Sequence, residues 1–173
     1  MTLAETLGLN RANPDYYALQ LGNHVLGGAF YATRLYQGLR EKSGLVYYVA
    51  SSFEVGQSRA IYTVNYACDP KNVFRARDIV EQNLKKMQMT PVTPQELHQA
   101  KALLLREIPL SEASVDSIAQ GLIYRASHDL PLDEPTRAAH QYLKLNAEQV
   151  QAAFAKWVRP NDLVQVTEGP TPK

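Results

Sequence analysis

Apolar residues recur along the chain with two spacings, one typical of strands and one typical of helices. They alternate with other residues over positions 45–55 and again over 60–68, with a short turn, Gly56-Gln57-Ser58, between the two segments. This pattern predicts two strands, Leu45–Val55 and Ala60–Cys68, joined as an antiparallel hairpin. The odd-numbered positions form the more apolar face of the first strand, and Tyr47 is on that face.

Helical spacing, with apolar residues three or four positions apart, covers most of the remaining chain. Helices are predicted over Asp15 to about Leu26, about Ala32 to Lys42, Val73 to Met87, Leu97 to Ile108, Val115 to about His128, Pro135 to Leu145, and Val150 to Trp157. Pro109 is expected to end or kink the helix before it. Two shorter segments, Thr2–Leu9 and Leu163–Thr167, are predicted strands, and the tail Gly169–Lys173 is expected to fray.

Start signals precede several of these helices. A capping residue followed by proline stands at Asn13-Pro14, at Asp69-Pro70 and at Thr93-Pro94. Such residues satisfy the free N–H groups of the first helical turn or pre-set its backbone. Glu96 and Gln149 each follow a cap by three residues, which predicts a capping box at both helix starts.

Strands and helices are partly segregated along the chain rather than alternating, which favours an α+β fold. We expect an antiparallel or mixed sheet with helices packed mainly on one face. The 173 residues are enough for one domain with a sizeable core, and no linker or internal repeat divides them. We therefore predict a single domain, residues 1–173.

Composition narrows the function classes. The net charge is +1, so electrostatics favours neither nucleic acid nor an anionic membrane as a partner. No apolar run approaches the roughly 20 residues of a membrane span, and no signal peptide opens the chain. The compartment stays open between a bacterial periplasm and cytoplasm. The single cysteine, Cys68, is interpreted as a small buried apolar residue.

The sequence lacks the motifs of a self-sufficient enzyme. None of the four histidines belongs to an HExxH or HxxEH motif, so no zinc site is predicted in this chain. Neither a GxSxG elbow nor a phosphate-binding loop is present. Glu41, Glu54 and Glu107 are isolated in sequence and are interpreted as solvated side chains. We predict that the chain itself holds no cofactor and no catalytic residue.

One stretch, Leu26–Ser52, combines a helix, a turn and a strand. The pair Ser43-Gly44 is expected to stop the helix, because glycine permits the left-handed backbone of helix ends. This arrangement brings Arg40, near the helix end, close to Tyr47 and Tyr48 at the strand start. A purely structural interpretation remains open, in which Arg40 interacts with the helix dipole and Tyr47 belongs to the core.

Four short segments of this stretch follow one another at fixed spacing: Leu26-Gly27-Gly28, Thr33-Arg34-Leu35, Leu39-Arg40-Glu41-Lys42 and Gly44-Leu45-Val46-Tyr47. Their pattern resembles the C-terminal, non-zinc half of the pitrilysin/insulinase family of zinc peptidases, which includes the mitochondrial processing peptidases. Thr33 departs from the serine usual at that position. Beyond Ser52 the similarity covers nearly the whole chain but is generic. The start looks truncated relative to the family domain.

The resemblance implies a function shared between two halves. One half carries HxxEH and binds zinc, and the other supplies an arginine and a tyrosine to the peptide in the common cleft. Arg40 and Tyr47 match that pair, and Tyr48 replaces Tyr47 if the strand register differs by one residue. The implied partners are an HxxEH-bearing domain or subunit, which holds the zinc, and a peptide substrate.

Two other functions stay open beside that of a substrate-binding half that is inactive alone. The chain could be a non-catalytic structural or assembly subunit of the same family, or an unrelated α+β binding domain. Without its other half it would expose an apolar face, so a homodimer of the isolated domain is expected.

Overall fold

The computed structural model describes residues 1–29 and 31–171. Its elements follow in the order β1 (Thr2–Leu7), α1 (Tyr16–Asn23), η1 (His24–Gly28), η2 (Tyr36–Lys42), β2 (Val46–Val55), β3 (Ala60–Cys68), η3 (Pro70–Asn72), α2 (Val73–Met89), α3 (Pro94–Leu110), α4 (Val115–Ser127), α5 (Glu134–Lys144), α6 (Ala147–Trp157) and β4 (Val164–Val166). The predicted α+β class is confirmed. Residues 172–173, part of the tail expected to fray, lie outside the described residues.

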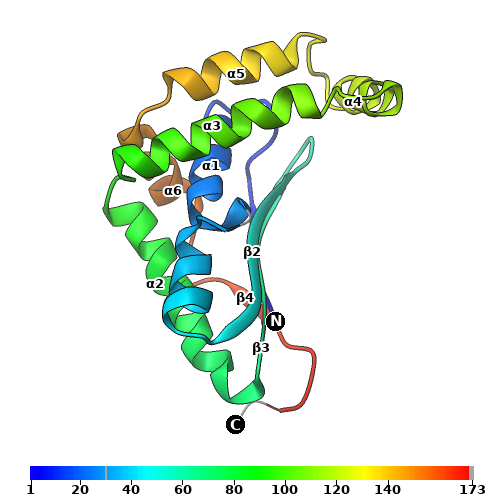
Figure 1. Cartoon of the computed structure of the whole chain (residues 1–173). Helices are drawn as coiled ribbons and strands as arrows, with labels where there is room; N and C mark the ends of the chain where they lie inside the picture. Colours follow the sequence, from blue (N-terminus) through cyan, green and yellow to red (C-terminus); the bar gives the residue numbers. More distant parts are fainter. Residues whose placement is uncertain (30, 172–173) are drawn as a thin grey trace.

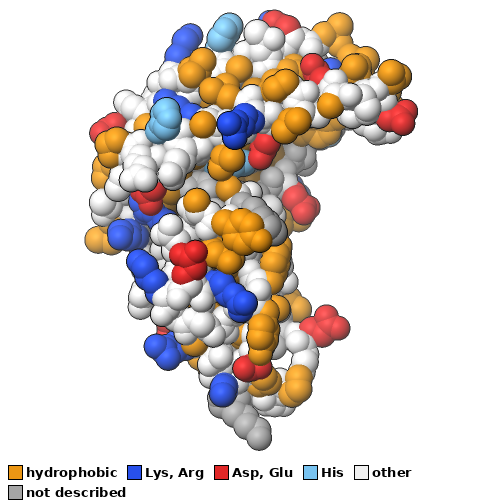
Figure 2. All heavy atoms as spheres, in the orientation of Figure 1, with side chains coloured by type: hydrophobic (Ala, Val, Ile, Leu, Met, Phe, Trp, Pro, Cys, Tyr) orange, Lys and Arg blue, Asp and Glu red, His pale blue; other side chains and the backbone are white. Residues whose placement is uncertain are grey.

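The four strands form one antiparallel sheet in the order β2-β3-β1-β4, so β2 lies at one edge. The hairpin predicted from alternation is confirmed, with Val55 opposite Ala60 at the turn. Helices cover one face of the sheet, and α4 projects past the end of the hairpin (Figure 1). In the space-filling view the outline is hollowed on the side away from the helix layer, beneath α4 (Figure 2).

The core lies between the sheet and the helix layer. From Val49 onward the odd-numbered positions of β2 face inward, so Ser51 and Phe53 are buried. The ring of Phe53 stacks on Tyr62 of β3 and meets Phe154 of α6 edge to face. These contacts bury large apolar surfaces, which is the main favourable contribution to folding.

The alternation of β2 breaks at its start. Val46 pairs with Cys68, and Tyr48 pairs with the preceding residue of β3, Ala67, so Tyr47 is an extra residue in the ladder. Such a bulge re-aims the side chains around it. Val46 is buried, whereas Tyr47 is 66% exposed. The interpretation of Tyr47 as a core residue is therefore wrong, because the bulge interrupts the period on which it rested.

The helix predicted from Ala32 to Lys42 is shorter and wider than expected. Its last seven residues form the π-helix η2, and the helix before it, α1, also continues as a π-helix, η1. Gly44, at φ +59°, ends η2. The amide of Gly44 donates to the carbonyl of Arg40, which is the αL motif of helix ends, and the amide of Leu45 donates to the carbonyl of Leu39. Both bonds satisfy free carbonyls at the helix end.

The other helix boundaries agree with the sequence within a few residues. Both predicted capping boxes are present, at Thr93 with Glu96 and at Asn146 with Gln149. Helix α3 ends one residue after Pro109, as the proline predicted. Cys68 is half-buried rather than buried, because it lies at the end of β3.

Glu96 links two parts of the helix layer. Besides its place in the capping box, its two carboxylate oxygens accept hydrogen bonds from Nε and Nη2 of Arg34, at 2.7 and 2.8 Å. This bidentate pair joins the chain just before η2 to the start of α3. The bonds from Arg34 lower the pKa of Glu96 to about 2.

We expect Glu96→Gln to lower the free energy of unfolding at pH 7 by about 1 kcal/mol, since a charge-assisted bond is lost in a partly exposed site. A carboxyl whose folded pKa is depressed contributes stability above its unfolded pKa and loses it as the pH falls toward the folded value. The deficit of the variant, measured by urea unfolding, should thus shrink between pH 5 and about 2.

The matched control is Glu148→Gln, which removes a carboxylate from the first turn of α6. Glu148 forms no ion pair with any other described residue, so its replacement should cost less than that of Glu96. Equal losses for the two variants at every pH would contradict a special role for the Arg34–Glu96 pair.

Candidate functional site

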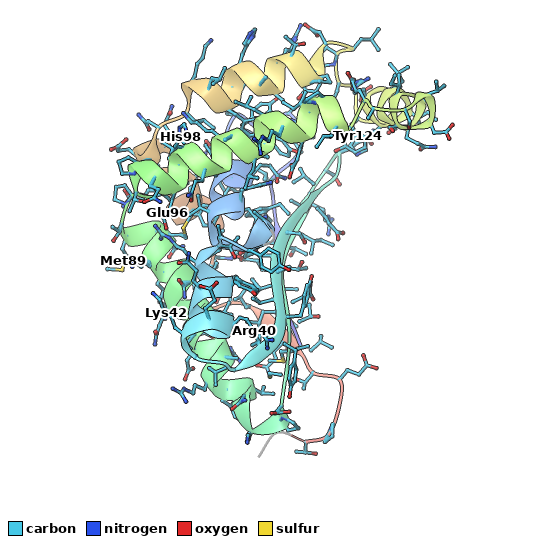
Figure 3. The ribbon with its side chains drawn as sticks, in the orientation of Figure 1. Arg40, Lys42, Met89, Glu96, His98 and Tyr124 are labelled. Atoms are coloured by element: carbon cyan, nitrogen blue, oxygen red, sulfur yellow. The ribbon has the colours of Figure 1, made fainter. Side chains whose placement is uncertain are left out.

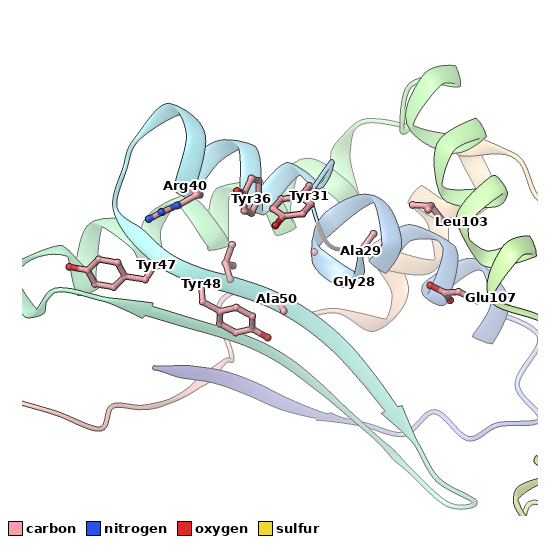
Figure 4. Close-up of a pocket in the computed structure, with 12 residues that line it drawn as sticks. Gly28, Ala29, Tyr31, Tyr36, Arg40, Tyr47, Tyr48, Ala50, Leu103 and Glu107 are labelled. Atoms are coloured by element: carbon pink, nitrogen blue, oxygen red, sulfur yellow. The ribbon is translucent and has the colours of Figure 1, made fainter. Parts of the chain in front are cut away.

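A pocket of about 670 Å³ lies along the start of β2, the edge strand of the sheet. Figure 4 shows Arg40 and Tyr47 at one end of it and two residues of α3, Leu103 and Glu107, at the other. The residues that line it are Gly27, Gly28, Ala29, Tyr31, Tyr36, Arg40, Tyr47, Tyr48, Val49, Ala50, Leu103 and Glu107. The two residues singled out from the sequence thus meet in one cavity.

Arg40 is held at the point where η2 gives way to β2. It lies in the last turn of η2, where a cation interacts favourably with the helix dipole. Its Nη1 donates a hydrogen bond to the carbonyl of Val46 at 2.9 Å. Among the described residues no other acceptor is recorded for this guanidinium, which has five N–H donors. Arg40 lies beside β2, whereas Lys42 lies on the far side of η2 (Figure 3).

Tyr47 reaches the pocket because of the bulge at the start of β2. Its hydroxyl donates a hydrogen bond to Oδ1 of Asp69 at 2.9 Å. The bond to the Asp69 carboxylate, together with its negative charge, raises the pKa of Tyr47, so the phenol keeps its proton at neutral pH. Tyr47 therefore has one hydroxyl proton to donate and a side chain that is largely in solvent.

Tyr48 also lines the pocket and is 53% exposed. In a regular strand, neighbouring side chains point to opposite faces. Here both tyrosines are exposed because the bulge inserts one residue between Val46 and Tyr48. Exposure therefore does not distinguish Tyr48 from Tyr47, whereas the hydrogen bond to Asp69 is made by Tyr47.

The wall of the pocket beside Tyr36 is a glycine pair in η1. A Cβ at Gly27 would lie 2.6 Å from Oγ of Ser51, and one at Gly28 would lie 2.5 Å from Nδ2 of Asn23. Asn23 and Ser51 bond each other: Nδ2 of Asn23 donates to the Ser51 carbonyl, and Oγ of Ser51 donates to Oδ1 of Asn23. The glycines therefore permit a close approach of η1 to β2.

Sequence reasoning missed three contributors to this site. Asp69 could have been found, because it directly follows β3, whose end pairs with the start of β2 where Tyr47 lies. Leu103 and Glu107 come from α3, which is far away in sequence, and no local signal marks them. The side chain of Glu107, interpreted from the sequence as solvated, is 61% exposed, and its Oε2 lies 3.4 Å from Nε2 of His24.

Within the described residues no three side chains of His, Cys, Asp or Glu lie close enough together to hold a metal ion. The donor set of this chain therefore does not fit zinc in the manner of an HxxEH peptidase. Over residues 1–29 and 31–171, no helix is both long enough and apolar enough to cross a bilayer.

A family model described as "Peptidase M16 inactive domain" matches residues 6–104. The chain is 31% identical over 94 residues to the probable inactive metalloprotease YmfF of Bacillus subtilis (strain 168), covering 54% of this chain and 21% of that protein. The chain thus spans about a fifth of the curated relative it matches.

Solved structures show the same fold. A peptidase M16 inactive domain from Pseudomonas fluorescens has a TM-score of 0.84 and 31% identity, covering 98% of this chain and 42% of that one. The inactive peptidase domain of a putative zinc protease from Bordetella parapertussis has a TM-score of 0.80 and 16% identity, covering 99% and 93%.

We expect Asp69→Asn to lower the pKa of Tyr47 toward the ordinary tyrosine value of about 10, because the variant removes the negative charge beside the phenol. Titration of ¹³C-labelled tyrosine followed by NMR measures this directly. Glu54→Gln, a neutralised carboxylate at the far end of β2, is the control and should leave the Tyr47 titration in place. An unchanged titration in Asp69→Asn would rule out the bond to Asp69 in solution.

Proposed function

The chain belongs to the peptidase M16 inactive-domain family, and on that premise we propose that it is the substrate-binding half of a zinc-dependent peptidase. It is a single domain that corresponds to the C-terminal half of a two-domain enzyme. It pairs with an HxxEH-bearing half, on the same chain or on a separate subunit, and is inactive alone. The observation that carries the proposal is that Arg40 and Tyr47 line one pocket at the edge of the sheet.

In this proposal Arg40 and Tyr47 donate hydrogen bonds to carbonyl oxygens of a bound peptide. An extended peptide has acceptors at regular intervals, and donors fixed beside them orient the chain and stabilise negative charge that develops during hydrolysis. An arginine side chain suits this role, because its guanidinium presents a fixed fork of N–H donors. Tyr47 donates to Asp69 in the free chain, and this exposed bond is readily exchanged for a peptide carbonyl.

Zinc belongs to the complementary half in this scheme, since the described residues here do not form a metal site. When bound there, zinc polarises the scissile carbonyl and activates a water molecule. The role of this chain is to bind and orient the peptide. Its pocket extends along β2 from Tyr47 to Ala50, a direction that suits an extended substrate.

A second candidate function is a non-catalytic structural or assembly subunit. The Bacillus subtilis relative is named a probable inactive metalloprotease, which favours this second function. In that role Arg40 would serve only to join η2 to β2 through the Val46 carbonyl. The rate of peptide turnover by the assembled enzyme distinguishes a substrate-binding half from a structural subunit.

We propose that the isolated chain also associates with a second copy of itself, because several large apolar side chains are exposed. These include Tyr47, Tyr48, Val115 and Ile123, at 66%, 53%, 82% and 61% exposure. Burial of such residues favours association.

We expect Arg40→Ala and Tyr47→Phe each to lower peptide turnover by about ten- to a hundredfold in the enzyme assembled with its zinc-loaded HxxEH half, since each removes one positioned donor. The measurement is the steady-state rate with a fluorogenic peptide. The chain alone should show no turnover. Sedimentation velocity of the chain, alone and mixed, establishes which assembly is present in the assay.

Lys42→Ala is the matched control, because it removes a cation from the same helix turn without touching the pocket. It should retain normal turnover. Thermal unfolding of all three variants should match that of the wild type. Near-normal turnover of both Arg40→Ala and Tyr47→Phe would instead support the structural subunit.

A further inference from the structure

A second cavity, of about 520 Å³, lies between α3, α4, α5 and the start of α1. Its walls are aromatic and aliphatic for the most part, with three tyrosines and several branched side chains. These include Tyr16, Leu104, Ile108, Tyr124, Leu130 and Tyr142. Tyr124 lies where α4 approaches the end of α3 (Figure 3). Two arginines, Arg11 and Arg125, also line the cavity, and each is 8% exposed.

Arg11 is tied to its surroundings. Its Nη2 donates to Oε1 of Glu134, which also accepts a hydrogen bond from the hydroxyl of Tyr17. Its guanidinium carbon lies 3.7 Å from the centre of the Tyr16 ring, a cation–π contact. Arg11 therefore has a buried carboxylate and an aromatic ring to balance its charge.

Arg125 is buried to the same extent but is poorly matched. Among the described residues its recorded partner is Glu112, whose Oε1 is 3.3 Å from Nη1, and the Glu112 side chain is 40% exposed. Nε of Arg125 is buried and has no hydrogen-bond partner among the described residues, and the same is true of Nε of Arg11. Leaving a buried charged donor unmatched costs free energy, which a bound acceptor would recover. The planar fork of an arginine suits a carboxylate or a phosphate, and of these two an unmodified peptide carries the carboxylate.

The two cavities are neighbours along α3. Glu107 lines both of them, with Leu103 on the side of the first cavity and Leu104 on the side of the second. Figure 4 shows the direction from Arg40 along β2 toward Glu107, and a peptide that follows it reaches the residue that also lines the second cavity. Its next side chain or its end can enter there.

We propose that the second cavity is a specificity subsite for a peptide carboxylate, bound by Arg125, with the apolar walls receiving the carbon atoms that carry it. The carboxylate belongs either to an acidic side chain or to the C-terminus of the peptide. The subsite deepens the proposed function, because it rests on peptides being the substrate. Glu112 competes for the same guanidinium and limits the affinity of the subsite.

The test is fluorescence anisotropy of labelled peptides with the chain. Three peptides of one neutral sequence are compared: an amidated one, the same peptide with a free C-terminus, and an amidated one with a single glutamate. We expect wild type to bind one carboxylate-bearing peptide about tenfold more tightly than the neutral one, as for a charge-assisted bond. Which peptide gains affinity identifies the source of the carboxylate.

Arg125→Gln should abolish this discrimination, and Glu112→Gln should increase it, because the competing carboxylate is gone. Arg106→Gln, an exposed arginine of α3 outside both cavities, is the control and should change nothing. Should Arg125→Gln fail to fold, as judged by circular dichroism, Glu112→Gln decides, since Glu112 is partly exposed. Unchanged discrimination in Glu112→Gln overturns the subsite.

Arg40→Ala separates this proposal from the proposed function. A loss of affinity that is equal for all three peptides supports the role of Arg40, and the carboxylate preference should persist in that variant. If the carboxylate preference is lost in Arg125→Gln but peptide affinity is unchanged in Arg40→Ala, the proposed function is rejected and the subsite is retained. Equal binding of the three peptides by wild type, or no binding, rejects the subsite.

Discussion

Two buried hydrogen bonds between Asn23 and Ser51 fix the distance between the first helical segment and the sheet. Asn23 is 3% exposed and Ser51 is 4% exposed, so neither side chain has water as an alternative partner. Buried polar groups of this kind must be matched, and an asparagine–serine pair is satisfied only in a narrow geometry. Gly27 and Gly28 follow from that constraint, because a side chain at either position would collide with the pair.

The pocket is a consequence of this close approach. Because η1 lies against β2, η2 must turn back and feed the chain directly into the edge strand. The αL motif at Gly44 provides the reversal, and Arg40 spans it to the Val46 carbonyl. The bulge that follows releases Tyr47 from the inward face. Two irregularities, a π-helix and a bulge, thus stand next to the site, as is common where side chains must be aimed at a ligand.

Helix α3 extends the site beyond the sheet edge. The Arg34–Glu96 pair fixes its start against the segment that precedes η2, so the position of α3 is coupled to that of Arg40. Further along, Glu107 borders both cavities. Helix α3 therefore borders both cavities, at the end of the first one that lies away from Arg40 and Tyr47.

Local patterns in the sequence predict the elements, their approximate ends and the proximity of Arg40 to Tyr47. These features depend on short-range rules: the hydrophobic period, caps such as Thr93, and a helix stop at Gly44, which lies between Arg40 and Tyr47 in the sequence. The family resemblance, drawn from residues of one stretch, is confirmed by the match over residues 6–104.

The direction in which Tyr47 points, and the residues that surround Arg40 and Tyr47, depend on tertiary structure. A bulge shifts the ladder by one residue, and the alternation of apolar positions does not reveal where it falls. Glu107 and Arg125 reach the cavities through the packing of α3 and α4, elements distant in sequence from β2. Contacts between such elements arise from the burial of whole faces, which no local pattern of residues specifies.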